Sequence, residues 1–283
     1  MEIKRIGVAG FGLMGGGIAQ VAAQAGYGVS VLEASDTFLQ NGFTTLEARL
    51  AKSVDKGKMP QGDAKALRER ISGTTSVKDL ANCDFIIEAI IENLQIKREL
   101  FSELDKLCPE HTILASNTSS IQIIEMATAT ERPDRFIGMH FFNPVPVMKL
   151  VEVVSTIQSS PASAQAATRL AESMGKTAIQ AKDRAGFVVN LLLVPYLLDA
   201  IRAYEIGLAT KEDIDTGMAL GCGHPMGPLT LLDMIGLDTI YSITGIMFDE
   251  FKDPKYAAPP LLKQMVKAGF YGRKSGKGFY DYR

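Results

Sequence analysis

Three side chains with the chemistry of proton transfer lie within one stretch of the sequence: Ser119, His140 and Glu152. His140 ends an apolar run, residues 135–140, and the phenylalanines and prolines that follow it predict a rigid, apolar rim. A histidine in that place exchanges protons near neutral pH. Glu152 lies in a valine-rich run, residues 149–155, where a carboxylate needs a partner. We therefore expect His140 to act as a general base or acid, with Glu152 fixing its tautomer.

The alternative for this pair is a core histidine hydrogen-bonded to a structural acid, with no catalytic duty. The other two histidines are expected to be structural, because His111 lies in a predicted loop and His224 precedes a proline at a predicted turn. No two histidines have the spacing of metal ligands, and the three cysteines form no CxxC pattern. The sequence predicts no metal site.

A glycine-rich loop joins the strand predicted at residues 3–9 to a helix predicted to run to Ala25. In the GxGxxG pattern the first glycine permits a tight turn, the second lets backbone N–H groups approach a diphosphate, and the third lets the helix pack closely on the strand. The helix N-terminus then stabilises the phosphates. The predicted cofactor contacts in this loop are Gly10, Gly12, Leu13, Met14 and Gly15. The alternative is a glycine-rich turn without function.

An acid follows at the spacing expected for a dinucleotide site. Glu33 ends the strand predicted at residues 28–33 and comes 23 residues after Gly10, close to the roughly 20 typical of the acid that binds the adenosine ribose. Its charge would repel a 2′-phosphate, so we expect NAD rather than NADP. The alternative is a solvated glutamate at a strand end.

Apolar strands alternate with helical patterns through the first two thirds of the chain, which predicts an α/β fold with a Rossmann-type, doubly wound parallel sheet in residues 1–184. Strand ends in such a sheet meet at one ligand-binding edge. Residues 185–283 have long helical patterns without β-rich runs and are predicted to form an all-helical domain. The charged run at residues 36–71 is expected to be helical, and its lysines either form a solvated face or bind a phosphate-rich substrate.

The composition excludes several classes of function. The formal net charge is −2, with scattered lysines and arginines, so nucleic acid is not an expected partner. Hydrophobic residues make up 46% of the sequence, which is enough for a large core. The longest apolar stretch, residues 187–198, is interrupted by Asn190 and Pro195 and is too short to span a bilayer. Scattered cysteines and the lack of a leader-like segment favour a cytoplasmic protein without a membrane partner.

Seven segments together resemble the 3-hydroxyacyl-CoA dehydrogenase family, and most closely its short, single-function 3-hydroxybutyryl-CoA dehydrogenases. They are GFGLMGGGIAQ, EAIIENLQIK, SNTSSIQI, GMHFFNPVPVMKLVEVV, GFVVN, HPMGPLTLLDMIGLD and GRKSGKGFY. The resemblance implies a Rossmann-type domain that binds NAD, a helical C-terminal domain that forms a homodimer, and an acyl-CoA substrate, acetoacetyl-CoA or 3-hydroxybutyryl-CoA.

The resemblance also assigns roles to residues that match the family's motifs. It implies that His140 is the catalytic base, Glu152 its partner, and Ser119 and Asn190 the residues that contact the substrate. It places five residues in the NAD site: Glu92, Lys97, Ser119, Asn143 and Lys274. Lys56 is the implied contact with coenzyme A. Phe11 departs from the family's small residue in the glycine loop and is expected to narrow the mouth near the phosphates.

Two other functions remain open from the sequence. Relatives with the same histidine and glutamate oxidise sugar acids such as gulonate without coenzyme A. Crystallin-like relatives suggest a dinucleotide-binding protein that has no reaction, although every implied catalytic residue is present here.

Overall fold

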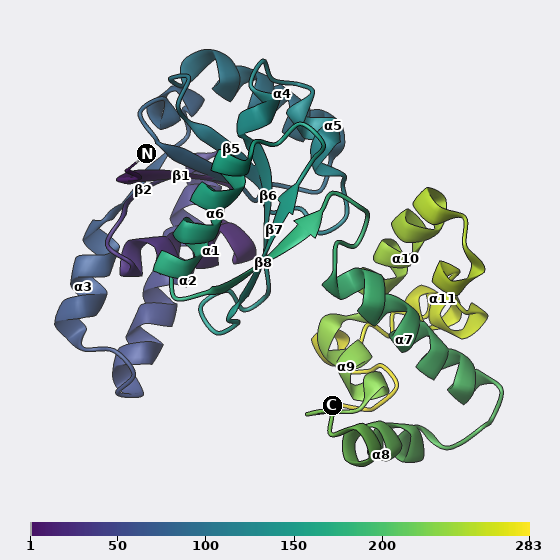
Figure 1. Ribbon diagram of the computed structural model, residues 1–283. Helices are drawn as coiled ribbons and strands as arrows, with labels where there is room; N and C mark the ends of the chain where they lie inside the picture. Colours follow the sequence, from purple (N-terminus) through teal and green to yellow (C-terminus); the bar gives the residue numbers. More distant parts are fainter. Residues whose placement is uncertain (1) are drawn as a thin grey trace. The chain divides into compact units, whose positions relative to one another are not determined.

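The computed structural model describes residues 2–283, which form two compact units. The first unit ends at Arg184 and the second spans Ala185–Arg283 (Figure 1). Each unit has its own cluster of buried apolar side chains.

The first unit is built on one sheet of eight strands in the order β3-β2-β1-β4-β5-β6-β7-β8. The strands are β1 (Arg5–Ala9), β2 (Gly28–Leu32), β3 (Ile71–Thr74), β4 (Phe85–Glu88), β5 (Ile113–Ser116), β6 (Phe136–Phe141), β7 (Leu150–Ser155) and β8 (Thr177–Lys182). Strands β1 to β6 are all parallel to one another. The chain order reverses between β1 and β4, the switch point where such sheets bind ligands. The predicted Rossmann-type sheet is confirmed.

The last two strands depart from the all-parallel sheet that the sequence predicts. Strand β7 is antiparallel to β6, and β8 is parallel to β7. The connection from β6 to β7, residues 142–149, is shorter than the dozen or so residues that a parallel crossover needs. The chain therefore turns back directly, and only the later helix α6 (Pro161–Ser173) provides a crossover, between β7 and β8.

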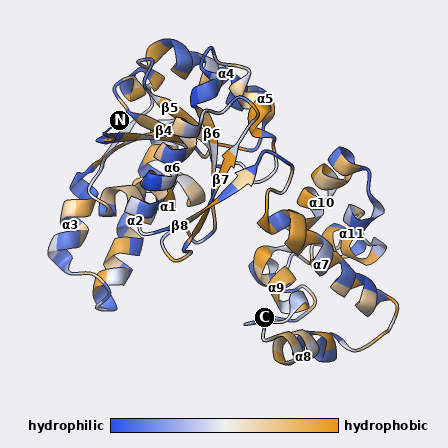
Figure 2. Ribbon diagram, viewed as in Figure 1, coloured by the Kyte–Doolittle hydropathy of each residue, from blue (hydrophilic) through white to orange (hydrophobic). Residues whose placement is uncertain are grey.

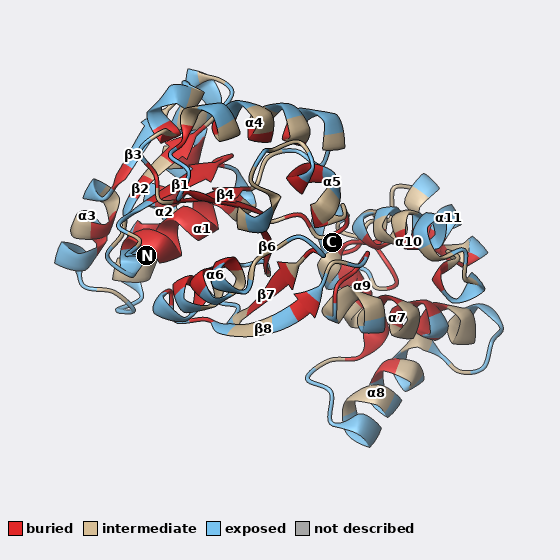
Figure 3. Cartoon of the chain, turned by 45° about the horizontal axis from the view of Figure 1, so that its top comes forward, coloured by how far each residue is buried: buried red, intermediate tan, exposed pale blue. Residues whose placement is uncertain are grey.

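Helices cover both faces of this sheet. One face is covered by α1 (Leu13–Gln24), α2 (Asp36–Asp55) and α6. The buried side chains of these helices share a cluster with Ile137, Met139 and Phe141 of β6. The opposite face contacts α4 (Leu94–Leu107) and α5 (Ile123–Ala127), and there the rings of Phe101 and Phe136 pack with their centroids 4.5 Å apart. Figure 3 shows α1 and the central strands as the most buried parts of the unit. The unit also contains α3 (Gln61–Glu69).

The run at residues 36–71 was predicted to be helical, but it is not helical throughout. Its last residue begins β3, an edge strand of four residues with the sequence ISGT. Only Ile71 of this strand is buried, so the run lacks the alternating apolar pattern by which a strand is predicted. Pairing with β2 determines its structure.

Helix α4 is amphipathic, but one member of its buried face is a lysine. Lys97, Phe101 and Leu104 are its buried residues, at the spacing of one helical face. Hydrophilic residues cover much of the rest of the helix (Figure 2). A lysine at a core position of this kind requires an ionic partner.

The second unit is helical and has a core of its own. Its helices are α7 (Val189–Glu205), α8 (Lys211–Cys222), α9 (Pro228–Ile235), α10 (Leu237–Phe251) and α11 (Pro260–Lys267). Pro195 lies inside α7. Among the described residues no single helix is long and apolar enough to cross a membrane, although α9 and α10, bent by 94°, meet the length and composition test as a pair.

The C-terminal residues are held by two buried acids of this unit. Asp233 accepts hydrogen bonds from the backbone N–H groups of Phe279 and Tyr280, both at 2.9 Å. Asp215 accepts from the hydroxyl of Tyr280 at 2.9 Å, and burial together with this acid raises the pKa of that tyrosine. The glycine-rich tail therefore completes the fold of the helical unit.

Candidate active site

The glycine loop has the close backbone approaches that its sequence predicts. Gly10 has a φ of +93°, and a Cβ atom there would lie 2.5 Å from the carbonyl oxygen of Ala89. A Cβ atom on Gly15 would lie 1.8 Å from the carbonyl oxygen of Gly10. Only glycine at these two positions lets the chain turn from β1 directly into α1.

The N-terminus of α1 has donors suited to a diphosphate. Gly12 is its N-cap and supplies no side-chain cap, and the first turn contains no acidic residue. The first hydrogen bond of the helix joins the Gly16 N–H to the Gly12 carbonyl at 2.9 Å. Within the described chain, the N–H groups of Leu13, Met14 and Gly15 have no hydrogen bond of their own, as expected in a first helical turn. These groups fit the phosphates of NAD.

Glu33 lies beside this loop, at the end of β2. Its carboxylate accepts hydrogen bonds from the Phe11 N–H at 2.6 Å and from the Ala34 N–H at 3.0 Å. The acid thus supports the glycine loop. A carboxylate has about four acceptor positions, so Glu33 retains capacity to bind ribose hydroxyls as the sequence predicts.

The expectation that Phe11 narrows the phosphate site is wrong. Its side chain is 2% exposed and packs against α2. Its ring lies 4.9 Å from the ring of Phe43 in an edge-to-face contact. Gly42 makes this possible, because a Cβ atom there would lie 2.3 Å from the ring. The large residue therefore fills the space between the loop and α2.

The predicted histidine and glutamate are in contact. His140 on β6 lies directly opposite Glu152 on β7 in the antiparallel register, and its Nδ1 is 2.6 Å from Oε2 of the acid. Glu152 is fully buried, and His140 is 7% exposed. Because a carboxylate only accepts, Nδ1 carries the proton and Nε2 is the acceptor of the neutral ring. The reversal of β7 is what brings the two residues together.

The segment after β5 connects Ser119 with the histidine strand. Asn117 accepts a hydrogen bond from the Phe141 N–H at 2.9 Å, one residue after His140. Ser119 is half-buried. Among the described residues no hydrogen bond of its hydroxyl is found, whereas both neighbouring hydroxyls, of Thr118 and Ser120, donate to Glu92.

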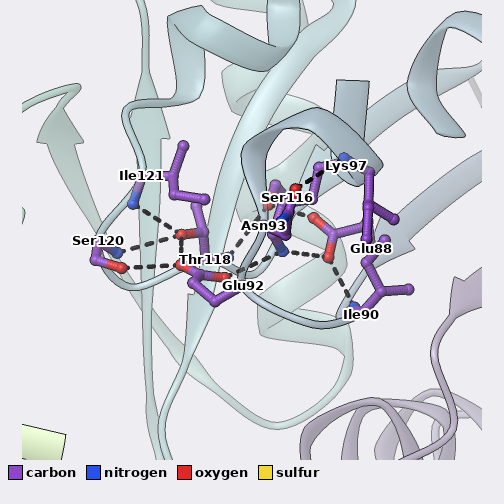
Figure 4. Close-up of polar contacts among 10 residues, drawn as sticks. Glu88, Ile90, Glu92, Asn93, Lys97, Ser116, Thr118, Ser120 and Ile121 are labelled. Carbon is purple, nitrogen blue, oxygen red and sulfur yellow. Dashed lines mark hydrogen bonds and ion pairs between the residues drawn. The ribbon is translucent and has the colours of Figure 1, made fainter. Parts of the chain in front are cut away.

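Glu92 and Lys97 belong to an ionic cluster that also includes Glu88 (Figure 4). The Lys97 ammonium lies 2.5 Å from Oε1 of Glu88 and 3.2 Å from Oε2 of Glu92. Lys97 is 1% exposed and Glu88 is fully buried. Burial raises the pKa of Glu92, but the Lys97 charge and the hydroxyls of Thr118 and Ser120 outweigh it, so the pKa lies below its ordinary value.

Glu88 was not predicted from the sequence to be a site residue. The signal was present, since Glu88 is an acid within the apolar run FIIEAI, and a buried carboxylate needs a partner. The partner, Lys97, lies on the helix that follows, and only the packing of that helix on the sheet shows the two to be paired.

The other predicted residues belong to other elements of the chain. Asn143 follows β6 and is exposed, and Lys56 is exposed at the C-terminus of α2. Asn190 lies in the first turn of α7, in the helical unit. Lys274 pairs with Asp238 in that same unit, with its Nζ 2.5 Å from Oδ1. Their roles toward NAD, substrate and coenzyme A stay predictions.

Comparisons with protein-family models and known proteins agree with this architecture. The model of the 3-hydroxyacyl-CoA dehydrogenase NAD-binding domain matches residues 5–184, and the model of the family's C-terminal domain matches residues 186–282. A Bacillus subtilis protein named probable 3-hydroxybutyryl-CoA dehydrogenase is 49% identical over 282 residues, which are 100% of this chain and 98% of that protein.

Two further relatives cover the chain to a similar extent. A Deinococcus radiodurans protein, also named probable 3-hydroxybutyryl-CoA dehydrogenase, is 50% identical over 278 residues, which are 98% of this chain and 100% of that protein. The crystal structure of (S)-3-hydroxybutyryl-CoA dehydrogenase from Ralstonia eutropha matches with a TM-score of 0.96 and 45% identity over 100% of both chains. The chain therefore belongs to the 3-hydroxyacyl-CoA dehydrogenase family of oxidoreductases, and residues 5–184 are its NAD-binding domain.

Proposed function

We propose that this protein interconverts (S)-3-hydroxybutyryl-CoA and acetoacetyl-CoA with NAD, and that His140 and Glu152 carry the proton transfer. The observation that carries this proposal is the 2.6 Å contact between the two side chains at the carboxyl edge of the sheet. The names of the relatives support the substrate, since the Ralstonia eutropha enzyme is called an (S)-3-hydroxybutyryl-CoA dehydrogenase.

In the oxidation direction His140 accepts the proton of the substrate's 3-hydroxyl group on Nε2. Its Nδ1–H donates to Glu152, which holds the ring in the required tautomer and stabilises the imidazolium that forms. In the reduction direction His140 returns the proton to the carbonyl oxygen. When bound, NAD supplies the hydride acceptor for carbon 3. Ser119 and Asn190 are proposed to orient the reacting oxygen, and Lys56 to bind coenzyme A.

The test of substrate class is NADH consumption with four substrates: acetoacetyl-CoA, a longer 3-ketoacyl-CoA, free acetoacetate and a keto sugar acid. The proposal predicts turnover of the thioesters with the highest specificity constant for acetoacetyl-CoA. Turnover of the free acids alone would instead support a sugar-acid type of dehydrogenase. NADH binding without turnover of any substrate would support a dinucleotide-binding protein without this reaction.

The test of the histidine is His140→Gln. Loss of a general acid–base typically lowers kcat by about 10²–10⁴-fold, while the dissociation constant for NADH should change little. His111→Gln is the matched control, because His111 is an exposed histidine of the same unit. Retention of most of the turnover by His140→Gln would remove this residue from the role of base.

We also propose a homodimer formed through the helical unit, and a cytoplasmic location. Leu192, Leu208 and Leu220 of that unit are 70%, 72% and 82% exposed, an apolar area that a second copy would bury. Light scattering of the purified protein tests the assembly, and a molar mass near that of one chain would contradict the homodimer.

Cell fractionation tests the proposed cytoplasmic location. Recovery of the protein in a membrane or secreted fraction would contradict that location.

A further inference from the structure

Two carboxylates and one ammonium hold the segment after β5 in place. Glu88 ends β4 beside Ser116, the last residue of β5. Its Oε2 accepts from the Ser116 hydroxyl at 2.6 Å, and its Oε1 accepts from the Ile90 N–H at 2.7 Å and from Lys97 at 2.5 Å. Every oxygen of this buried acid is thus occupied, and Lys97 connects it to Glu92.

The second half of the cluster fixes the residues around Ser119. Glu92 accepts from the hydroxyls of Thr118 and Ser120, the residues on either side of Ser119. The Thr118 oxygen in turn accepts from the N–H groups of Ser120 at 3.2 Å and Ile121 at 3.0 Å. Figure 4 shows this continuous set of contacts from Glu88 to Ile121. The backbone at Ser119 is therefore constrained on both sides.

We propose that Glu88 is a positioning residue that acts through Lys97 and Glu92 to set the position of Ser119. This inference rests on the proposed function, in which Ser119 contacts the substrate. Glu88 is fully buried, so it acts without touching substrate. Lys97 is 1% exposed, which assigns it to the same supporting cluster.

The test is a double-mutant cycle between Glu88→Gln and Ser119→Ala, with kcat measured at saturating NADH and acetoacetyl-CoA. Glu88→Gln removes the charge that orients Lys97, and we expect kcat to fall roughly 10²-fold, the scale of a misplacement of about 1 Å. In the Ser119→Ala background the same substitution should lower kcat less than about threefold, because the residue it positions is already gone. Equal effects in both backgrounds would overturn the proposal.

Two further variants keep the test decisive. Thr118→Val breaks the cluster at its far end without exposing or removing a buried charge, so it replaces Glu88→Gln in the cycle if that variant does not fold. It should show the same loss of effect with Ser119→Ala, and full additivity would overturn the proposal. Glu99→Gln, on the exposed side of α4 where Glu99 accepts a hydrogen bond from Gln95, is the control and should retain wild-type kcat.

Hydrogen exchange separates this inference from the proposed reaction. The N–H groups of Thr118, Ser120 and Ile121 bond to oxygens within the cluster, so their exchange should accelerate in Glu88→Gln relative to Glu99→Gln. Unchanged exchange would overturn the positioning role even if the wild-type enzyme turns over acetoacetyl-CoA. Faster exchange in a protein whose wild type lacks that activity would support the positioning and reject the proposed reaction.

Discussion

At the scale of single residues, the partly exposed carboxylate of Glu92 shows how neighbours decide a charge state. Burial alone would favour its protonated form, but Lys97 and two hydroxyls stabilise the ionised form and hold its pKa below the ordinary 4.5. A carboxyl group with a lowered pKa stabilises the fold above its ordinary pKa. That stabilisation disappears as the pH falls through the lowered value.

Glu92→Gln should therefore lower the melting temperature at pH 7, and the difference from wild type should shrink as the pH falls below 4.5. Thermal unfolding followed by circular dichroism between pH 7 and pH 3 measures this difference. Because the side chain is 40% exposed, solvent screening limits its size. A difference that stays constant down to the lowest pH would show that the ionised form of Glu92 is not what stabilises the segment.

At the scale of elements, the packing of the glycine loop on α2 depends on one glycine. Gly42 lies within α2, where replacement of glycine by alanine ordinarily stabilises a helix by up to about 1 kcal/mol. Here the added Cβ atom would lie 2.3 Å from the Phe11 ring and 2.8 Å from the Phe11 carbonyl oxygen. The backbone oxygen belongs to the loop that turns into α1 and cannot move away easily.

We expect Gly42→Ala to lower the free energy of unfolding by about 1–3 kcal/mol, the usual cost of overpacking. Gly62→Ala in α3 is the matched control, because a Cβ atom there meets nothing within 4 Å, and it should be neutral or stabilising. Urea unfolding of both variants measures the effect. If Gly42→Ala is as stable as the control, the loop and α2 are not packed as described.

The elements also show what a sequence can predict. The strand, glycine loop and helix at the N-terminus follow from local patterns and are confirmed. The contact between His140 and Glu152 depends on the antiparallel register of β6 and β7, a long-range pairing that the expectation of an all-parallel sheet did not include. Strand β3 was missed because it is short and mostly exposed. Glu88 was missed because its partner lies on another element.

At the scale of the whole molecule, the three cysteines are distributed so that they report on the two units separately. Cys83 and Cys108 lie in the first unit, where they are 2% and 7% exposed, and Cys222 is an exposed residue of the second. Burial raises the pKa of both Cys83 and Cys108 to about 11. Only the thiolate reacts with disulfide reagents, so both the low exposure and the raised pKa protect these two thiols in the folded protein.

Titration with Ellman's reagent at pH 8 should therefore give one fast thiol in the native protein and three after denaturation. The slow reaction of Cys83 and Cys108 then requires opening of the first unit. That unit is the NAD-binding domain, and a ligand at 100 times its dissociation constant stabilises the bound form by about 2.7 kcal/mol. NADH at that concentration should lower the rate of the slow reaction of Cys83 and Cys108 roughly 100-fold. The rate of the fast reaction of Cys222 should stay unchanged. A slow phase that is insensitive to NADH would show that the buried thiols are reached through local openings remote from the cofactor site.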